Sequence, residues 1–131
     1  MIVLDTHAWI WWVSNPDLLS KHAAQVLSKA VREKSILVSS ISAWEVAMLV
    51  KKGRLKLSMP PEEWIARSER LSFLNFVPVD NSVLLKSVNL SEKFSQDPAD
   101  RIIVATALLQ GAKLVSKDAS IRKAKVVDVV W

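Results

Sequence analysis

The chain has 131 residues, half of them hydrophobic, with a formal net charge of +5, a pI near 9.7 and no cysteine. This length suits a single domain, residues 1–131, which can bury a core without disulfides or a structural metal. The lack of cysteine excludes thiol catalysis and cysteine-ligated zinc. No apolar run approaches the ~18 residues of a membrane span, and the basic balance favours an anionic partner such as nucleic acid. We therefore expect a soluble, cytoplasmic protein with no membrane partner.

Short apolar runs predict five β-strands, which are, in chain order, "MIVL", "SILVSS", "LNFVPV", "AKLVS" and "KVVDVVW". Segments of helical length lie between most of these runs. We predict helices over Lys21–Glu33, Ala43–Lys52, Pro61–Leu71, Ser82–Lys93 and Pro98–Gln110. Gly53 and Gly111 are placed to stop two of these helices at their C-terminal ends.

The alternation of strands and helices predicts an α/β fold. Its sheet should be mostly parallel and lie between two helical layers, because "MIVL" and "ILV" are apolar on both faces. Pro78 within "LNFVPV" has no backbone N–H to donate to a neighbouring strand. We therefore expect this strand at one edge of the sheet and "KVVDVVW" at the other.

Acidic residues accompany these elements at four places. Asp5 follows the first strand, Asp118 lies three residues past the apolar part of "KLVSK", Glu45 lies in the helix after "SILVSS", and Asp100 opens the helix before "AKLVS". The carboxyl ends of parallel strands and the starts of the returning helices meet at one edge of a sheet. We therefore expect four neighbouring carboxylates, which must either raise their pKa values or bind a cation. All-oxygen ligands suit Mg²⁺ or Mn²⁺.

Three of these acids also have a purely structural explanation. Ser42 and Glu45 have the S-x-x-E spacing of a capping box. Asp5 could cap the "THAWIWW" segment, and Asp118 could open a turn before residues 119–123. Single acids therefore do not establish a site, and the inference depends on their meeting at one edge.

The stretch "DPADR" contains two acids with different local roles. Asp97 is a favoured N-cap residue, and Pro98 suits the first helical position. Asp100 would lie in the first turn, where the helix dipole stabilises a carboxylate by roughly 0.3–1 kcal/mol.

Asp80 follows the edge strand, and we interpret it as the N-cap of the next helix and leave it out of the site.

Four blocks in fixed order span almost the whole chain: "LDTHAWIWW", "VSSISAWEVAMLVKKGRLKL", "DPADRIIVATAL" and "KLVSKDASI". Together they resemble the PIN-domain family, most closely the toxin subunits of VapBC-type toxin–antitoxin pairs. The resemblance implies a three-layer α/β/α sandwich with a five-stranded, mostly parallel sheet. The family's acidic residues carry over as Asp5, Glu45, Asp100 and Asp118. Residues that by resemblance support the site are Thr6, Ser40, Arg101 and Ser116.

The implied function is that of a toxin, a metal-dependent endoribonuclease that hydrolyses RNA phosphodiester bonds. By resemblance, Mg²⁺ or Mn²⁺ held by Asp5, Glu45 and Asp100 would activate a water, and a second ion at Asp118 would stabilise the leaving 3′ oxygen. The implied partners are a cognate VapB-like antitoxin and a second copy of the chain in a homodimer.

Several other residues are candidate substrate contacts. His7 follows Asp5 closely, and Trp9, Trp11 and Trp12 could stack on bases, although aromatic residues of this kind more often fill a core or a partner interface. Basic residues could bind phosphate or simply remain solvated. These are Lys51, Lys52, Arg54, Lys56, Lys117, Arg122, Lys123 and Lys125.

Two other classes of function compete with the nuclease. Phosphatases and receiver domains also gather aspartates at a sheet edge, but the first strand here is followed by "DTH" where a haloacid-dehalogenase-type phosphatase has D-x-D. The second alternative is a non-catalytic RNA- or partner-binding PIN-like module, in which the acids only cap helices. Replacing Asp100 by Asn separates these possibilities.

Overall fold

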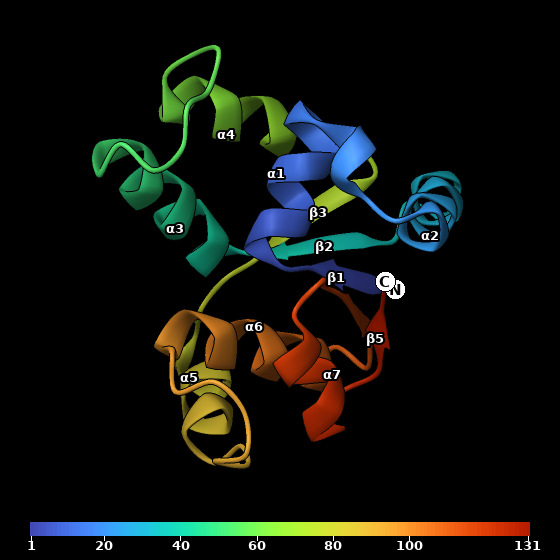
Figure 1. The fold of residues 1–131 in the computed structure, drawn as a ribbon, viewed down its shortest axis with the longest axis vertical. Helices are drawn as coiled ribbons and strands as arrows, with labels where there is room; N and C mark the ends of the chain where they lie inside the picture. Colours follow the sequence, from blue (N-terminus) through green and yellow to red (C-terminus); the bar gives the residue numbers. More distant parts are fainter.

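A computed structural model describes all 131 residues. Five strands form one sheet in the order β3-β2-β1-β4-β5, and every neighbouring pair is parallel (Figure 1). The strands are β1 (Ile2–Leu4), β2 (Ile36–Ser39), β3 (Leu74–Val77), β4 (Lys113–Val115) and β5 (Val129–Val130). The edge strands are β3, which ends directly before Pro78, and β5. The predicted parallel sheet and both of its predicted edges are confirmed.

Helices cover both faces of this sheet. α1 to α4 lie on one face and α5 to α7 on the other, which confirms the three-layer α/β/α arrangement (Figure 1). The helices are α1 (Thr6–Ser14), α2 (Lys21–Glu33), α3 (Ser40–Lys51), α4 (Pro61–Glu69), α5 (Asn81–Val88), α6 (Pro98–Leu109) and α7 (Ala119–Ala124), with a short 3-10 helix, η1 (Pro16–Leu18), after α1. None of them combines the length and apolar character that crossing a membrane would require.

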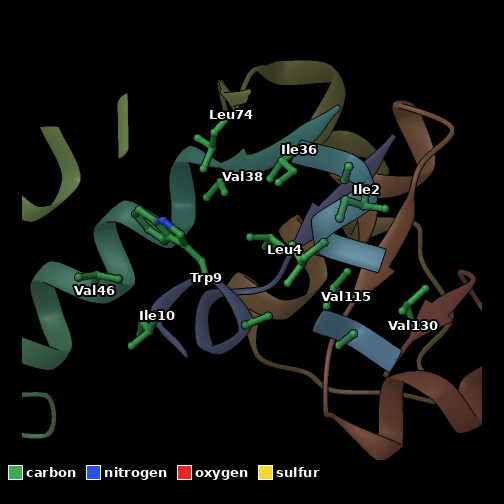
Figure 2. Close-up of a cluster of buried hydrophobic side chains, with 14 of the residues drawn as sticks. Ile2, Leu4, Trp9, Ile10, Ile36, Val38, Val46, Leu74, Val115 and Val130 are labelled. Atoms are coloured by element: carbon green, nitrogen blue, oxygen red, sulfur yellow. The ribbon is translucent and has the colours of Figure 1, made fainter. Parts of the chain in front are cut away.

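The strands divide their side chains between two buried clusters, one on each face of the sheet. Ile2 and Leu4 of β1 pack with Trp9 and Val46 under α1 to α4 (Figure 2). Val3, between them, points to the opposite face and packs under α5 to α7. Because successive residues of a strand face opposite sides, a central strand covered on both faces must be apolar throughout.

Glycine ends α3 and α6, as the sequence predicts. Gly53 (φ 72°) and Gly111 (φ 62°) both adopt the left-handed conformation. After α3, the N–H of Arg54 donates to the carbonyl of Leu49 (2.9 Å), which satisfies a free carbonyl of the last turn.

The start of α3 differs from the prediction. The helix begins at Ser40 instead of Ala43, because the hydroxyl of Ser39 accepts from the N–H of Ile41 (3.3 Å) and caps it there. Glu45 consequently lies in the second turn of α3, so the capping-box interpretation of Glu45 is wrong.

The end of α5 also differs. A helix predicted over Ser82–Lys93 stops at Val88. The guanidinium of Arg101 donates to the carbonyls of Ser87 (3.1 Å) and Leu90 (2.7 Å). A side chain from α6 thus satisfies carbonyls that a longer helix would have paired internally, and the chain turns away.

Two short helices were not among the predicted helices. The "THAWIWW" segment forms α1, and the residues after Asp118 form α7 in place of a turn. Lys125 ends α7 in the left-handed conformation (φ 54°), so only Val129–Val130 of the predicted strand "KVVDVVW" pairs with β4.

Candidate active site

A pocket of about 610 Å³ opens at the carboxyl edge of the sheet, beside the ends of β1 and β4. The residue after β1, the helices α1 and α3, the start of α6 and the loop between β4 and α7 all contribute to it. Its lining consists of Asp5, Thr6, His7, Trp11, Glu45, Asp97, Asp100, Lys117 and Asp118. The structure thus brings together the four acids that the sequence places at one rim.

Asp5 combines a capping role with a place in the pocket. Its Oδ1 accepts from the N–H of Ala8 (2.8 Å) and caps α1. Burial raises the pKa of Asp5, and repulsion from Asp118 adds to this, whereas a hydrogen bond with Ser116, the bond from Ala8 and the nearby His7 act in the opposite direction. Ionisation of this carboxyl group in the pocket therefore costs free energy, and a bound cation would reduce that cost.

Asp118 is the only one of the four acids whose pKa is lowered. Its Oδ1 accepts from the N–H of Ser120 (2.8 Å) and so caps α7, and its own N–H donates to the hydroxyl of Ser116 (3.1 Å). Burial acts to raise its pKa, but the hydrogen bonds from Ser120 and Ile121 outweigh this and lower the pKa. Asp118 therefore carries a stable negative charge.

Glu45 and Asp100 cap no helix. Burial raises the pKa of Glu45, and repulsion from Asp100 and Asp97 adds to it, against a hydrogen bond donated by the hydroxyl of Thr6. Burial also raises the pKa of Asp100, where only a hydrogen bond with Ser95 opposes the repulsion of the surrounding acids. Helix capping does not explain why these two carboxylates are placed here.

The donor set fits a hard divalent cation. The acids line the pocket at separate positions. In their present conformations, no three His, Cys, Asp or Glu side chains are close enough together to hold one ion. Their oxygens are nevertheless the ligands that Mg²⁺ and Mn²⁺ prefer, and with one histidine and no cysteine the pocket does not suit zinc. A cation would also relieve the repulsion that raises the pKa values of Asp5, Glu45 and Asp100.

Four residues were expected to support the site, and the structure places only two of them, Thr6 and Ser116, beside the acids. Thr6 and Ser116 are buried beside the acids. The hydroxyl of Thr6 also shares a hydrogen bond with that of Ser42 (2.9 Å), a buried residue of α3 for which the sequence suggested only a cap. Ser40 is exposed at the start of α3 and does not line the pocket, so the structure does not bring it to the acids.

Arg101, the fourth expected supporting residue, points away from the pocket. Its buried guanidinium donates to four backbone carbonyls around the C-terminal end of α5 and the connection to α6, and it lies 5.2 Å from the centroid of the Phe94 ring. It forms no ion pair with an acid. Arg101 therefore fastens the segment that leads into Asp97 and does not itself contact the site.

Asp97 lines the pocket although sequence reasoning assigned it only a cap. It is the N-cap of α6, where its carboxylate accepts from the N–H of Ala99 (3.2 Å). Its charge also raises the pKa values of Glu45 and Asp100. The signal was present in "DPAD", because residues three apart lie on the same side of a helix start.

The tryptophans of α1 have three different environments. Trp9 is fully buried, and its Nε1 donates to the hydroxyl of Ser68 (3.1 Å). Trp12 packs edge-on against Phe73. Only Trp11 lines the pocket, together with His7, and Lys117 is the one lining residue among the basic residues named above.

Comparisons with known proteins identify the family of this chain. A model of the PIN domain matches residues 2–127. The chain is 35% identical over 122 residues to ribonuclease VapC22 of Mycobacterium tuberculosis, covering 92% of this chain and 89% of that protein.

Solved structures with the same fold share less sequence. They include VapBC2 from Rickettsia felis bound to a promoter DNA fragment (16% identity, TM-score 0.73, 98% of this chain and 97% of that one) and FitAcB from Neisseria gonorrhoeae (20%, 0.70, 98% and 96%). DNA-bound VapBC from Salmonella typhimurium is a third (18%, 0.68, 98% and 95%). On the match of its sequence over nearly its whole length, this chain belongs to the PIN domain family.

Proposed function

We propose that this protein is a metal-dependent endoribonuclease, the toxin component of a toxin–antitoxin system, which hydrolyses phosphodiester bonds of RNA. Its similarity to a ribonuclease supports the substrate class. The observation that carries the proposal is the placement of Glu45 and Asp100 in the pocket, as partly buried acids without a capping role whose pKa values are raised. The helices do not require acids at these two positions, whereas a reaction that depends on a bound cation requires carboxylates to hold it.

We infer that Asp5, Glu45, Asp100 and Asp118 hold the ion, Mg²⁺ or Mn²⁺. When bound, such an ion supplies a water activated for attack on phosphorus and stabilises the charge on the phosphate. The protein's own residues orient the acids. The hydroxyl of Thr6 holds Glu45, and Ser116 lies between Asp5 and Asp118.

The order in which the acids give up their protons supports the same assignment. Asp118, with its lowered pKa, remains charged over the widest pH range and would attract the cation. Asp5, Glu45 and Asp100 have raised pKa values and gain most from the positive charge. At a pH where these three acids still hold protons, ion binding would release them.

We further propose that the protein acts in the cytoplasm, pairs with a VapB-like antitoxin and forms a homodimer. The solved relatives include toxin–antitoxin complexes. Exposed apolar side chains support contacts with other proteins, because monomeric surfaces rarely gather them. Leu84, Leu85 and Val88 of α5 are 41%, 66% and 76% exposed, and Trp44 of α3 is 55% exposed.

The test is RNA cleavage by antitoxin-free protein in Mg²⁺ or Mn²⁺, with EDTA as the metal-free control. Asp100→Asn is compared with Asp80→Asn, which makes the same chemical change at a helix cap outside the pocket. Loss of a ligand should exceed the 10- to 100-fold cost typical of outer-shell residues, so we expect Asp100→Asn to lose at least about 100-fold in rate. Asp80→Asn should remain active, and the products should carry 5′-phosphates.

Two results would contradict the proposal. Cleavage that persists in EDTA would remove the metal from the reaction. If wild type, Asp80→Asn and Asp100→Asn bind RNA equally well and none of them cuts it, the non-catalytic binding module is the better description.

A further inference from the structure

One wall of the pocket is not acidic. It consists of His7, Trp11 and Lys117, and Trp11 is the single hydrophobic residue among those that line the pocket. The same pocket is also lined by Glu45 and, at the start of α6, by Asp97 and Asp100. An acidic pocket that only held a cation would not require an aromatic ring, so this wall needs an explanation of its own.

The phase of α1 places the ring there. His7 and Trp11 are four residues apart and share a helix face, with ring centroids 5.7 Å apart. Trp9, about 200° away around the helix, is buried under α3 and α4. The Trp11 ring is only partly buried and also packs against Trp131, at 5.8 Å between ring centroids. It is therefore held in a fixed position with part of its surface facing the pocket.

Lys117 adds a positive charge over one face of this ring. Its Nζ lies 5.8 Å from the ring centroid of Trp11, within the range of a cation–π contact, and the side chain is exposed. A flat apolar surface next to a cation matches two parts of one nucleotide, because the base can stack on the ring while the phosphate meets the ammonium. A bound peptide would need a wider apolar surface than one ring.

We propose that Trp11 is a stacking platform for one unpaired base of the RNA and that Lys117 binds the adjoining phosphate, so that the phosphodiester is presented to the carboxylates. The inference rests on the proposed function and adds a substrate preference to it. RNA must be single-stranded at the site, since bases inside a duplex cannot offer their faces to an indole ring. His7 and Trp131 are positioning residues that hold the ring.

Binding is measured separately from cleavage, so that the two proposals can fail independently. The Asp100→Asn protein serves as the background, in Mg²⁺, with a short fluorescein-labelled single-stranded RNA followed by anisotropy. Adding Trp11→Leu should weaken binding by roughly five- to 150-fold, the range expected for loss of one stacked base. Trp12→Leu, which removes packing on the same helix, should leave the RNA affinity unchanged. Trp11→Phe should recover most of the affinity that Trp11→Leu loses.

Two further measurements identify the chemistry. A duplex of the same sequence should bind with equal affinity to the Asp100→Asn protein with and without the Trp11→Leu substitution. Lys117→Gln, at an exposed position where folding is not at risk, should reduce the slope of log affinity against log salt by about 0.7, the value for one phosphate contact on a single strand.

The inference is overturned if Trp11→Leu and Trp12→Leu bind the single strand equally well, in which case the wall packs the fold or meets a protein partner. It is also overturned if Trp11→Leu weakens single strand and duplex to the same extent. Should Trp11→Leu not fold, an unchanged salt slope in Lys117→Gln together with full affinity would overturn it as well. Failure of wild type to cleave RNA would instead count against the proposed function.

Discussion

The starts of α5 and α6 look alike in sequence and differ in what they contribute. Asp80 caps α5 by accepting from the N–H of Val83 (3.0 Å), and Asp97 caps α6 by accepting from the N–H of Ala99 (3.2 Å). α5 follows the edge strand β3 and packs on α6, whereas α6 packs on the central strands β1 and β4. Only the start of α6 therefore reaches the pocket, and there a second acid, Asp100, adds to the charge. The comparison shows that a cap becomes part of a site through its position on the sheet.

The largest effect expected from this difference concerns metal binding. An ion that binds only the folded protein should raise its free energy of unfolding by about 2.7 kcal/mol at 100 times the dissociation constant. Asp80→Asn should retain this gain in Mg²⁺, and Asp100→Asn should lose most of it. Urea unfolding followed by circular dichroism, in Mg²⁺ and in EDTA, measures both. Equal gains in the two variants would mean that the start of α6 does not take part in ion binding.

A smaller effect should appear when the caps themselves are removed. In EDTA, Asp80→Ala should lower the free energy of unfolding by about 0.5–2 kcal/mol, the usual cost of losing an N-cap. Asp97→Ala should cost less, because it also removes a charge that raises the pKa values of Glu45 and Asp100. The same unfolding measurement compares them. If Asp97→Ala costs as much as Asp80→Ala, repulsion in the pocket has little influence on stability.

The smallest effect is a dependence on pH. The folded-state pKa of Asp100 is raised above its ordinary value of 3.8, so the folded protein holds this proton more tightly than the unfolded chain. Its contribution to stability is therefore present at low pH and is lost as the pH rises through the raised pKa. In EDTA, wild type should become progressively less stable relative to Asp100→Asn as the pH rises above 3.8. Saturating Mg²⁺ should suppress this trend, and a difference that does not vary with pH in EDTA would contradict it.

Much of the fold could be predicted because its signals are local. The strand segments are apolar runs, and Gly53 and Gly111 mark the ends of two helices. α1 was harder to predict because three tryptophans leave it without a clear polar face, and α7 because it buries only Ile121. The early end of α5 was not predictable from its own residues, since Arg101 of another helix causes it.

The same division applies to the candidate site. The positions of Asp5, Glu45, Asp100 and Asp118 after strands and at helix starts, together with the family resemblance, identified the acids that the pocket gathers. Ser42 was missed because its hydroxyl partner, Thr6, comes from a distant part of the chain. Sequence also could not tell which tryptophan of α1 faces the pocket, because Ser68 and Trp131 determine how the helix packs.

The amino-acid sequence by itself determined the five strands, five of the seven α-helices, the two edge strands and the acids available at the carboxyl edge of the sheet. These depend on apolar runs, on glycine and proline, and on residue spacing, all of which act over a few neighbouring positions. The tertiary structure alone decided which acids are partly buried without a capping role, that Arg101 binds backbone carbonyls and does not line the pocket, and that Trp11 and Lys117 line it together. Desolvation, repulsion and ring packing involve residues far apart in the chain, so these properties arise only when the sheet brings them together.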